Sequence, residues 1–365
     1  MKKILIFSNP FGSGPSGKAV SIAKYIFDHT SGADIIFCGS KPLLSIANNE
    51  FVCKEIDDRD QESIIRLLNS ISGNRFVISS QNRFAIKAAN KCGIPSAFLD
   101  GLSWFWNKIP EDHFIADIIF WINYPGVKNK IPASCKNKIF MIHGITERLE
   151  GLNLSRRNGI EFYLGGCKNP LASIPYSYLN LTADLLSHAI EKSLISNIST
   201  DHESRKYLTR YPKVAKKIKI SNHTNFLKRI SRSELFVTNG GQTAATEAVC
   251  LNTPVAFFLP MNLSQLSLID KVLLDNKNYP SLCWSTYITM PLNIISFSEK
   301  QTLEYFENVS NDIMSDDKKS SLIREDFLQI LARGKNIPPP QILKSLGSEG
   351  AENIFCILKE KWNLN

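Results

Sequence analysis

The chain has 365 residues, of which 43% are hydrophobic and 21% are charged. This composition is that of a globular protein of about two domains, and it excludes disordered, collagen-like and coiled-coil proteins. The longest nearly uninterrupted apolar run, 114–121, is far shorter than the ~20 residues of a membrane-spanning helix. The first apolar run ends at Asn9-Pro10, too soon for a signal peptide, so we expect a cytoplasmic protein.

The net charge of +9 is unevenly distributed. Between Ser204 and Ser233 there are ten Lys or Arg and no Asp or Glu. Such a stretch can bind nucleic acid or an anionic membrane surface, or it can be a solvated face or a rim that attracts an anionic small substrate. Tyr207, Tyr211 and Phe226 interleave the stretch, but no nucleic-acid-binding motif accompanies it. A nucleic-acid-binding protein therefore stays an alternative, and peripheral membrane contact is not indicated.

Strands and helices alternate in the first half of the chain. Short apolar runs predict strands at 3–8, 34–38, 51–56, 76–79, 95–100 and 139–142, and helical spacing predicts helices at 19–28, 60–70 and 83–92. Strands separated by helices are typical of βαβ crossovers. We therefore expect a mostly parallel sheet.

A polar, charged segment at 144–159 separates this half from a second alternation. There we predict strands at 217–220, 235–237 and 255–258, and helices at 176–194, 203–211, 224–230, 243–251, 265–274, 299–314 and 318–331. Prolines 338–340 break the chain before a last helix, 349–362. The predicted domains are 1–150 and 151–340, followed by a C-terminal helical segment, 341–365.

A glycine-rich loop at 12–18 nearly matches two phosphate-binding motifs. Lys18 is followed by Ala19, which lacks the hydroxyl that a P-loop uses to hold Mg²⁺. A dinucleotide fold needs an acidic residue near the end of the second strand, where 38–40 reads Cys-Gly-Ser. Neither an NTPase nor a dehydrogenase is favoured. Backbone N–H groups at the helix start remain suited to a polar ligand.

The most informative segment follows the strand at 235–237. The paired glycines 240–241 let phosphates approach the backbone where the next helix begins, and the helix N-terminus favours anions. Glu247 lies one to two turns further on, where its carboxylate can accept hydrogen bonds from ribose hydroxyls. Polar residues 264–265 follow the next strand, at the same edge of the sheet. One nucleotide can touch all of these residues.

This order of residues resembles the donor-binding segment of GT-B glycosyltransferases, including the transferase that makes lipid II and the UDP-sugar transferases of small molecules. The matching positions are Gly241, Glu247, Pro254, Pro260 and Gln265. The chain departs from the pattern at Ala244, at Ser264 and by one extra residue between the prolines. Segment 160–167 is similar to the first strand and glycine turn of the family's C-terminal domain.

The resemblance implies an α/β protein with the GT-B fold: two Rossmann-like parallel-sheet domains facing across a cleft, and a C-terminal helix that crosses back to the N-terminal domain. It implies an acceptor in the first domain and a nucleotide sugar, UDP-linked, in the second, without a cofactor or a required metal. The histidines and cysteines show no metal-ligand spacing either. The donor-binding residues are expected to be Gly166, Phe226, Leu227, Gly240, Gly241, Gln242, Thr243, Glu247, Ser264 and Gln265.

The catalytic base is not evident from the family pattern. Relatives carry a His just after the first glycine loop, where this chain has Lys18, and an ammonium is a poor base unless it is desolvated. By position, the catalytic candidates are Asp100 and His143, each of which ends a predicted strand. Asp100 can instead be a helix N-cap or turn residue, and His143 a structural histidine. A retaining mechanism, which needs no such base, stays open.

The acceptor is expected to contact the first helix start and an aromatic segment. These residues are Gly14, Ser16, Gly17, Lys18, Trp104 and Trp106, although the tryptophans can equally be core. The stretch 98–110, with Tyr124-Pro-Gly downstream, is similar to the cytosylglucuronate synthases of nucleoside-antibiotic biosynthesis. This implies cytosine as acceptor and UDP-glucuronate as donor. A nucleotide-sugar hydrolase or epimerase with the same fold is the closest alternative.

Overall fold

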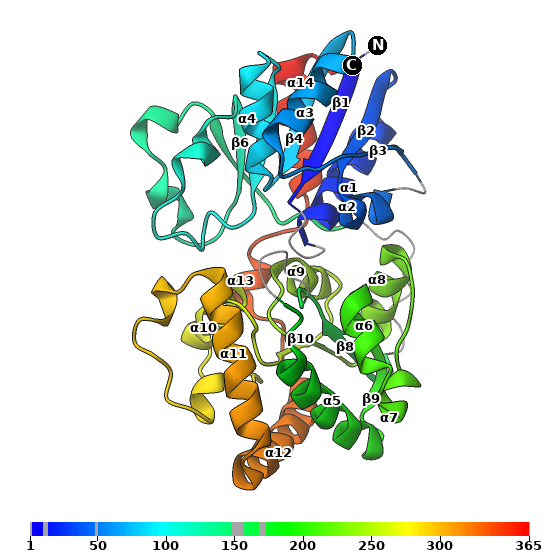
Figure 1. Ribbon diagram of the computed structural model, residues 1–365, viewed down its shortest axis with the longest axis vertical. Helices are drawn as coiled ribbons and strands as arrows, with labels where there is room; N and C mark the ends of the chain where they lie inside the picture. The colour runs from blue at the N-terminus through cyan, green and yellow to red at the C-terminus, as the bar shows by residue number, and fades with distance from the viewer. Residues whose placement is uncertain (1, 10–13, 48–49, 148–156, 168–172, 365) are drawn as a thin grey trace. The chain divides into compact units, whose positions relative to one another are not determined.

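The computed structural model describes residues 2–9, 14–47, 50–147, 157–167 and 173–364, without the side chains of Pro42, Ser45 and Ile46. The chain is an α/β protein that divides into two compact units (Figure 1). Unit 1 comprises residues 1–147 and 345–365, and unit 2 comprises residues 148–344. Gly12 of the glycine-rich loop and most of the predicted boundary segment lie outside the described residues.

Unit 1 is built on a seven-stranded parallel sheet with the order β3-β2-β1-β4-β5-β6-β7. Its strands are β1 Lys2–Ser8, β2 Ala33–Gly39, β3 Val52–Glu55, β4 Asn74–Ser80, β5 Ser96–Asp100, β6 Ile118–Ile122 and β7 Ile139–Ile142. Its helices are α1 Gly14–His29, α2 Lys41–Ala47, α3 Gln61–Ser70, α4 Arg83–Lys91 and α14 Gly350–Trp362, with short 3₁₀ turns at Glu111–Phe114 (η1), Val127–Lys130 and Ala133–Cys135. The expected parallel sheet is confirmed.

Local chemistry explains where these elements begin. The central strands are continuous apolar runs because both faces are covered by helices, and Ile4 to Phe7 of β1 are fully buried. Asp60 caps α3 by accepting hydrogen bonds from the backbone N–H groups of Glu62 and Ser63, and Asn82 caps α4 in the same way.

The C-terminal helix belongs to unit 1, as expected. Helix α14 packs against α1 and β7, and in Figure 1 it lies, coloured red, beside the blue N-terminal elements. Before it, Gly144 donates to the carbonyl of Leu346, and Ile145 pairs with Glu349 in an antiparallel bridge. The return of the C-terminal helix to the first domain is confirmed.

Unit 2 contains a four-stranded parallel sheet with the order β11-β10-β8-β9. Its strands are β8 Ile160–Leu164, β9 Ile195–Thr200, β10 Leu235–Thr238 and β11 Val255–Phe257. Its helices are α5 Tyr176–Glu191, α6 His202–Leu208, α7 Pro212–Ala215, α8 His223–Arg232, α9 Gln242–Cys250, α10 Leu263–Asp275, α11 Glu299–Met314, α12 Asp317–Gly334 and α13 Gln341–Lys344, with 3₁₀ turns at Trp284–Thr286 and Ile294–Ser296.

In unit 2, the end of one predicted helix and one predicted strand were wrong. The helix predicted over 176–194 ends at Glu191, because Ser193 turns the chain with a φ of 58° and β9 starts at Ile195. The strand predicted over 217–220 is a single bridge between Ile198 and Ile218, after which Ile220 is 78% exposed.

The order of the strands in each sheet indicates where a ligand would bind. In unit 1 the order reverses between β1 and β4, and in unit 2 between β8 and β10. Ligands of open α/β sheets bind at the carboxyl ends of strands on either side of such a reversal. The turns after β8 and β10 are therefore the natural ligand position in unit 2.

Candidate functional site

The glycine turns after β8 and β10 are tied together by side chains. Asn239 is fully buried, and its amide donates a hydrogen bond to the carbonyl of Gly165 at 2.9 Å. Gln265 donates to the same carbonyl at 3.4 Å and accepts from the backbone N–H of Met261 at 2.7 Å. Three segments of unit 2 are thereby fixed around one point at the carboxyl edge of the sheet.

Glycine is required in these turns. Gly240 has a φ of +86°, and a Cβ there would lie 3.0 Å from the carbonyl oxygen of Gln265 and 3.2 Å from the Ile269 side chain. Gly166 has a φ of +79°. In contrast, a Cβ on Gly241 would meet no described atom within 4 Å, so the turn is open at the residue that precedes α9.

Helix α9 carries the remaining residues of the predicted donor set. Gln242 and Thr243 form its first turn and are partly exposed. Glu247 follows and is only 4% exposed. Its Oε1 lies 2.9 Å from Nε2 of His223, the first residue of α8. His223 is not among the predicted site residues, because the predicted helix starts one residue later, at 224.

The other predicted donor residues lie close by but are largely enclosed. Phe226 is 9% exposed and packs against the rings of Tyr163 and Phe236, while Leu227 is 1% exposed. The hydroxyl of Ser264 contacts the side chain of Asn262, which caps α10. The donor-binding role of Phe226 and Leu227 stays a prediction, and Leu227 offers almost no surface to a ligand.

In unit 1, the structure pairs Asp100 with a histidine that the sequence analysis did not single out. Asp100 ends β5 and is 1% exposed. One carboxylate oxygen lies 2.9 Å from Nδ1 of His113, and the other accepts from the backbone N–H of Leu102 at 2.9 Å. Within the described ranges, Nε2 of His113 has no hydrogen-bond partner. A carboxylate that orients the Nδ1–H leaves Nε2 as a proton acceptor.

His143, the other predicted catalytic residue, has different neighbours. Its Nδ1 lies 2.9 Å from Oε2 of Glu349, and its backbone N–H donates to the side chain of Asn353. Hydrogen bonding from the backbone N–H of Ser348, with a further contribution from the His143 charge, lowers the pKa of Glu349. His143 thus joins the end of β7 to the C-terminal segment.

Of the predicted acceptor residues at the start of α1, Ser16 and Lys18 are buried, and Gly14 and Gly17 are partly exposed. Gly14 begins the helix, the Ser16 hydroxyl lies 2.9 Å from that of Ser8, and a Cβ on Gly17 would meet no described atom within 4 Å. Lys18 is 4% exposed, and its ammonium lies so close to Gly101 that a Cβ there would be 2.9 Å from Nζ.

The aromatic segment is divided between core and surface. Trp104 is 4% exposed, donates to the carbonyl of Gly101 and lies 4.9 Å from the ring of Tyr124, which is the packing of a core residue. Trp106 is partly exposed, with its ring 5.9 Å from that of His113. Lys130 donates to the carbonyls of both tryptophans and fixes the loop.

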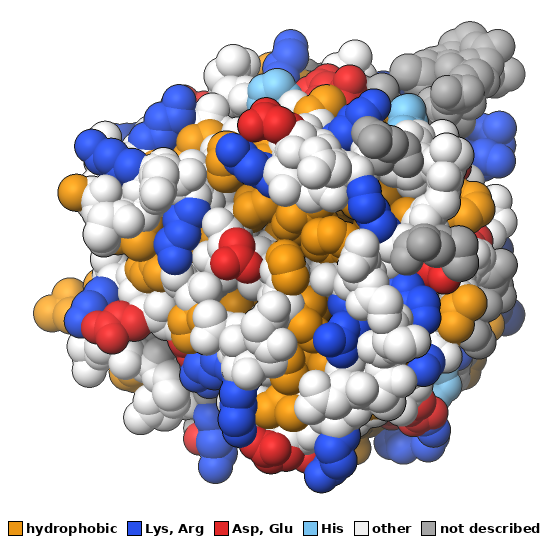
Figure 2. Space-filling model, turned by 90° about the horizontal axis from the view of Figure 1, so that it is seen from above, with side chains coloured by type: hydrophobic (Ala, Val, Ile, Leu, Met, Phe, Trp, Pro, Cys, Tyr) orange, Lys and Arg blue, Asp and Glu red, His pale blue; other side chains and the backbone are white. Residues whose placement is uncertain are grey.

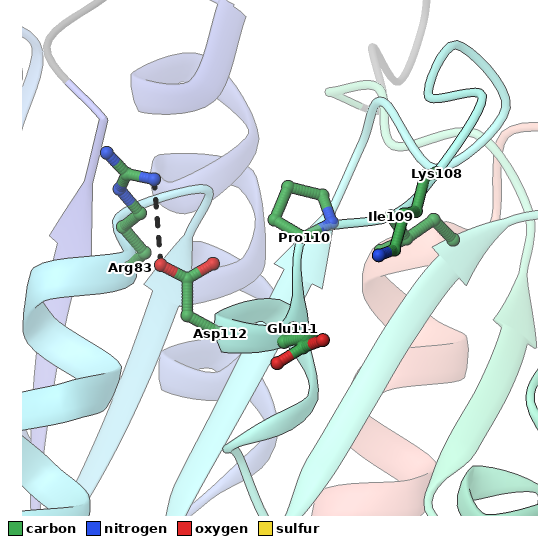
Figure 3. Close-up of a pocket in the computed structure, with 6 residues that line it drawn as sticks. All are labelled: Arg83, Lys108, Ile109, Pro110, Glu111 and Asp112. Carbon is green, nitrogen blue, oxygen red and sulfur yellow. Dashed lines mark ion pairs between the residues drawn. The ribbon is translucent and has the colours of Figure 1, made fainter.

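A shallow pocket of about 500 Å³ lies beside this loop (Figure 3). Its lining residues are Arg83, Lys108, Ile109, Pro110, Glu111 and Asp112. Burial raises the pKa of Asp112, but the hydrogen bond and charge of Lys87 and the charge of Arg83 outweigh it, so the pKa is lowered. The pocket presents both charges, and η1 carries part of its lining together with His113.

Across the described residues, no group of three His, Cys, Asp or Glu side chains could hold a metal ion. No helix in the described part of the chain has the length and apolar character to cross a membrane.

Comparisons with known proteins give a match in structure. No protein-family model matches the chain, and no curated protein matches it in sequence. MurG from Acinetobacter baumannii matches with a TM-score of 0.51 and 12% identity over 99% of this chain and 100% of that one. Phytolacca americana UGT2, complexed with UDP-2-fluoro-glucose and pterostilbene, matches with a TM-score of 0.52 and 12% identity over the full length of both chains. The chain has the GT-B fold.

A UDP-GlcNAc 2-epimerase from Neisseria meningitidis, bound to UDP-GlcNAc, matches this GT-B chain as well. The TM-score is 0.55, with 12% identity over 99% of this chain and 100% of that one. Identities this low show the fold alone, so the reaction has to be argued from the residues.

Proposed function

We propose that the protein is a glycosyltransferase that moves a sugar from a UDP-linked donor to a small acceptor. One observation carries the donor half of this proposal: the open, paired-glycine turn leads directly into the helix that carries the buried carboxylate of Glu247. The five-residue step from Gln242 to Glu247 spans about 7.5 Å along a helix. This is similar to the separation between the phosphates and the ribose hydroxyls of a nucleotide. The diphosphate would take the N–H groups at the start of α9, and the ribose would take Glu247.

The choice of a uridine nucleotide is supported by two of the similar structures, which are bound to UDP-2-fluoro-glucose and to UDP-GlcNAc. During transfer, the leaving diphosphate would be stabilised by the N–H groups and partial positive charge of the α9 N-terminus. This role of α9 requires no metal ligand from the protein.

For the acceptor half, we propose that His113 removes the acceptor's proton as it attacks the anomeric carbon. Its Nε2 takes the proton, while Asp100 holds Nδ1–H and stabilises the imidazolium that forms. Asp100 is then a positioning residue. Of the predicted acceptor residues, Trp106 contacts this pair, with its ring centroid 5.9 Å from that of His113. More specifically, we propose that the acceptor is cytosine and the donor is UDP-glucuronate. The reaction would then belong to nucleoside-antibiotic biosynthesis in the cytoplasm.

A second candidate keeps the site and changes the reaction to epimerisation or hydrolysis of the nucleotide sugar. The structural match to a UDP-GlcNAc 2-epimerase favours it. Incubation with UDP-GlcNAc and no acceptor, followed by proton NMR, separates the cases. Inversion at C2 identifies an epimerase, free sugar identifies a hydrolase, and transfer that requires an acceptor identifies a transferase.

Nucleic-acid binding has less support from the positions of the side chains. In the basic stretch, Arg229 pairs with Glu161, and the hydroxyls of Tyr207 and Tyr211 both donate to the side chain of Asn180. On the face drawn in Figure 2, acidic, basic and apolar side chains are interspersed. Salt-sensitive retention on heparin without any binding of UDP would favour this alternative.

The experiment that tests the proposed function is a thermal-shift panel of UDP, ADP, GDP and NAD. A ligand that binds the folded state raises its melting temperature in proportion to the logarithm of concentration over Kd. We expect UDP to give the largest shift. An absence of stabilisation by any uridine nucleotide would remove the donor assignment.

A further inference from the structure

We propose that His223 is a positioning residue that holds the Glu247 carboxylate in the orientation that receives the ribose. This inference rests on the proposed function, since it assigns a role to His223 at the same site. The two residues are 24 positions apart in the sequence and come from different helices, α8 and α9.

The geometry fixes the imidazole on two sides. Its Nε2 lies 2.9 Å from Oε1 of Glu247, and its ring centroid lies 6.1 Å from that of Phe226. Phe226 is itself held by the rings of Tyr163 and Phe236. Asn222 caps α8 by accepting from the backbone N–H of Asn225 at 2.9 Å, which sets the position of the first helical residue, His223.

The carboxylate needs such a partner. A glutamate side chain has three rotatable torsions, and Glu247 is 4% exposed, so water alone cannot satisfy its oxygens. A carboxylate can accept several hydrogen bonds. The bond from His223 occupies one direction on Oε1 and fixes the plane of the group, which leaves the other oxygen free to meet a ribose hydroxyl in one orientation.

Replacement of His223 should therefore lower nucleotide affinity, because it disturbs the contact between Glu247 and the ribose. Loss of one hydrogen bond to a charged group is expected to weaken UDP binding about tenfold in His223→Ala. His223→Gln places an amide N–H near the position of Nε2, so we expect it to stay within about threefold of the wild type. His223→Asn is too short to reach, so it should behave like His223→Ala, and it is the matched control.

The test is isothermal titration of the full chain with UDP and with 2′-deoxy-UDP. We expect His223→Ala to weaken the binding of UDP more than the binding of 2′-deoxy-UDP. In a Glu247→Ala background, His223→Ala should have no further effect on affinity. Equal losses in the Gln and Asn variants, or the same loss for both nucleotides, would overturn the inference. So would a His223→Ala effect that persists in the Glu247→Ala background.

These outcomes separate the inference from the proposed function. A wild-type chain that binds no UDP refutes the donor site itself, and the role of His223 is lost with it. Wild-type binding of UDP with unchanged affinity in His223→Ala refutes only the role of His223. Melting temperatures without nucleotide show whether each variant is folded, and the Gln and Asn pair decides the question should the Ala variant not fold.

Discussion

Replacement of Arg229 by Met should destabilise unit 2, because it leaves the buried carboxylate of Glu161 without a charged partner. Glu161 in β8 is fully buried and accepts from Nε of Arg229 at 3.2 Å and from the Ser199 hydroxyl at 2.6 Å. Arg229 is 21% exposed, and its Nη2 also donates to Ser199. Met preserves much of the apolar stem but removes the charge and every hydrogen bond of the guanidinium.

Breaking a buried ion pair on one side costs about 3 to 5 kcal/mol, since the remaining charge is uncompensated. We expect a loss of that size in the unfolding free energy at pH 7.5. Burial raises the pKa of Glu161 above its ordinary 4.5, and Ser199 and Arg229 oppose this rise. Without Arg229 the folded-state pKa should rise further.

The sign of the pH dependence follows from that shift. A carboxyl whose pKa is raised by folding keeps its proton longer in the folded state, so stability is lost as pH rises from 4.5 through the folded-state pKa. The deficit of Arg229→Met should therefore shrink toward pH 4.5, where Glu161 is mostly protonated in the folded state and half protonated in the unfolded state. Glu161→Gln combined with Arg229→Met should recover most of the stability and be insensitive to pH in this range.

Hydrogen–deuterium exchange of β8 peptides at pH 4.5 and 7.5, corrected for intrinsic exchange rates, measures the loss of stability around Glu161. A local measurement is needed because a chain of two units need not unfold in a single step. A deficit under about 1 kcal/mol at pH 7.5 is below the range for a buried pair and would refute the reasoning. An equal deficit at both pH values would refute the role of Glu161 ionisation.

The other predictions concern the site. Glu247→Ala should weaken UDP binding by about 1.5 to 3 kcal/mol in calorimetry, whereas Glu325→Ala, an exposed carboxylate on α12, should leave it unchanged. If both variants bind UDP like the wild type, the ribose does not contact Glu247. Gly240→Ala should destabilise by about 1 to 3 kcal/mol, because its φ is +86° and the new Cβ would lie 3.0 Å from the carbonyl of Gln265. Unaltered urea unfolding would contradict this. His113→Gln should reduce turnover of the UDP-sugar about 100-fold or more at unchanged UDP affinity, and near-normal turnover would exclude His113 as the proton acceptor.

The fold could be predicted from local patterns because its central strands are short and apolar. Ile4 to Phe7 read as a buried strand, and that strand is β1. The errors came where the local pattern is ambiguous. The sequence 190–195 contains no Gly, Pro or Asn to mark the end of α5, and the left-handed turn at Ser193 separates this helix from β9. The β propensity of 217–220 does not form a strand because only Ile218 pairs with β9.

Some residues of the candidate site could likewise be predicted from local sequence, and others could not. The glycines at 240–241 and Glu247 could be predicted because the turn and the helix that carry them are contiguous in the sequence. His113 and His223 could not, because their partners lie 13 and 24 residues away and meet them only in the folded chain. For His223 there was one usable signal: Asn222 is a good helix cap, which would have placed His223 in the first turn of α8.

A crystal structure of the chain with UDP would test the central claim most directly. The account predicts the diphosphate at the backbone N–H groups of Gln242 and Thr243, with a ribose hydroxyl within hydrogen-bonding distance of the Glu247 carboxylate. A nucleotide bound away from the start of α9, or a ribose turned from Glu247, would contradict it.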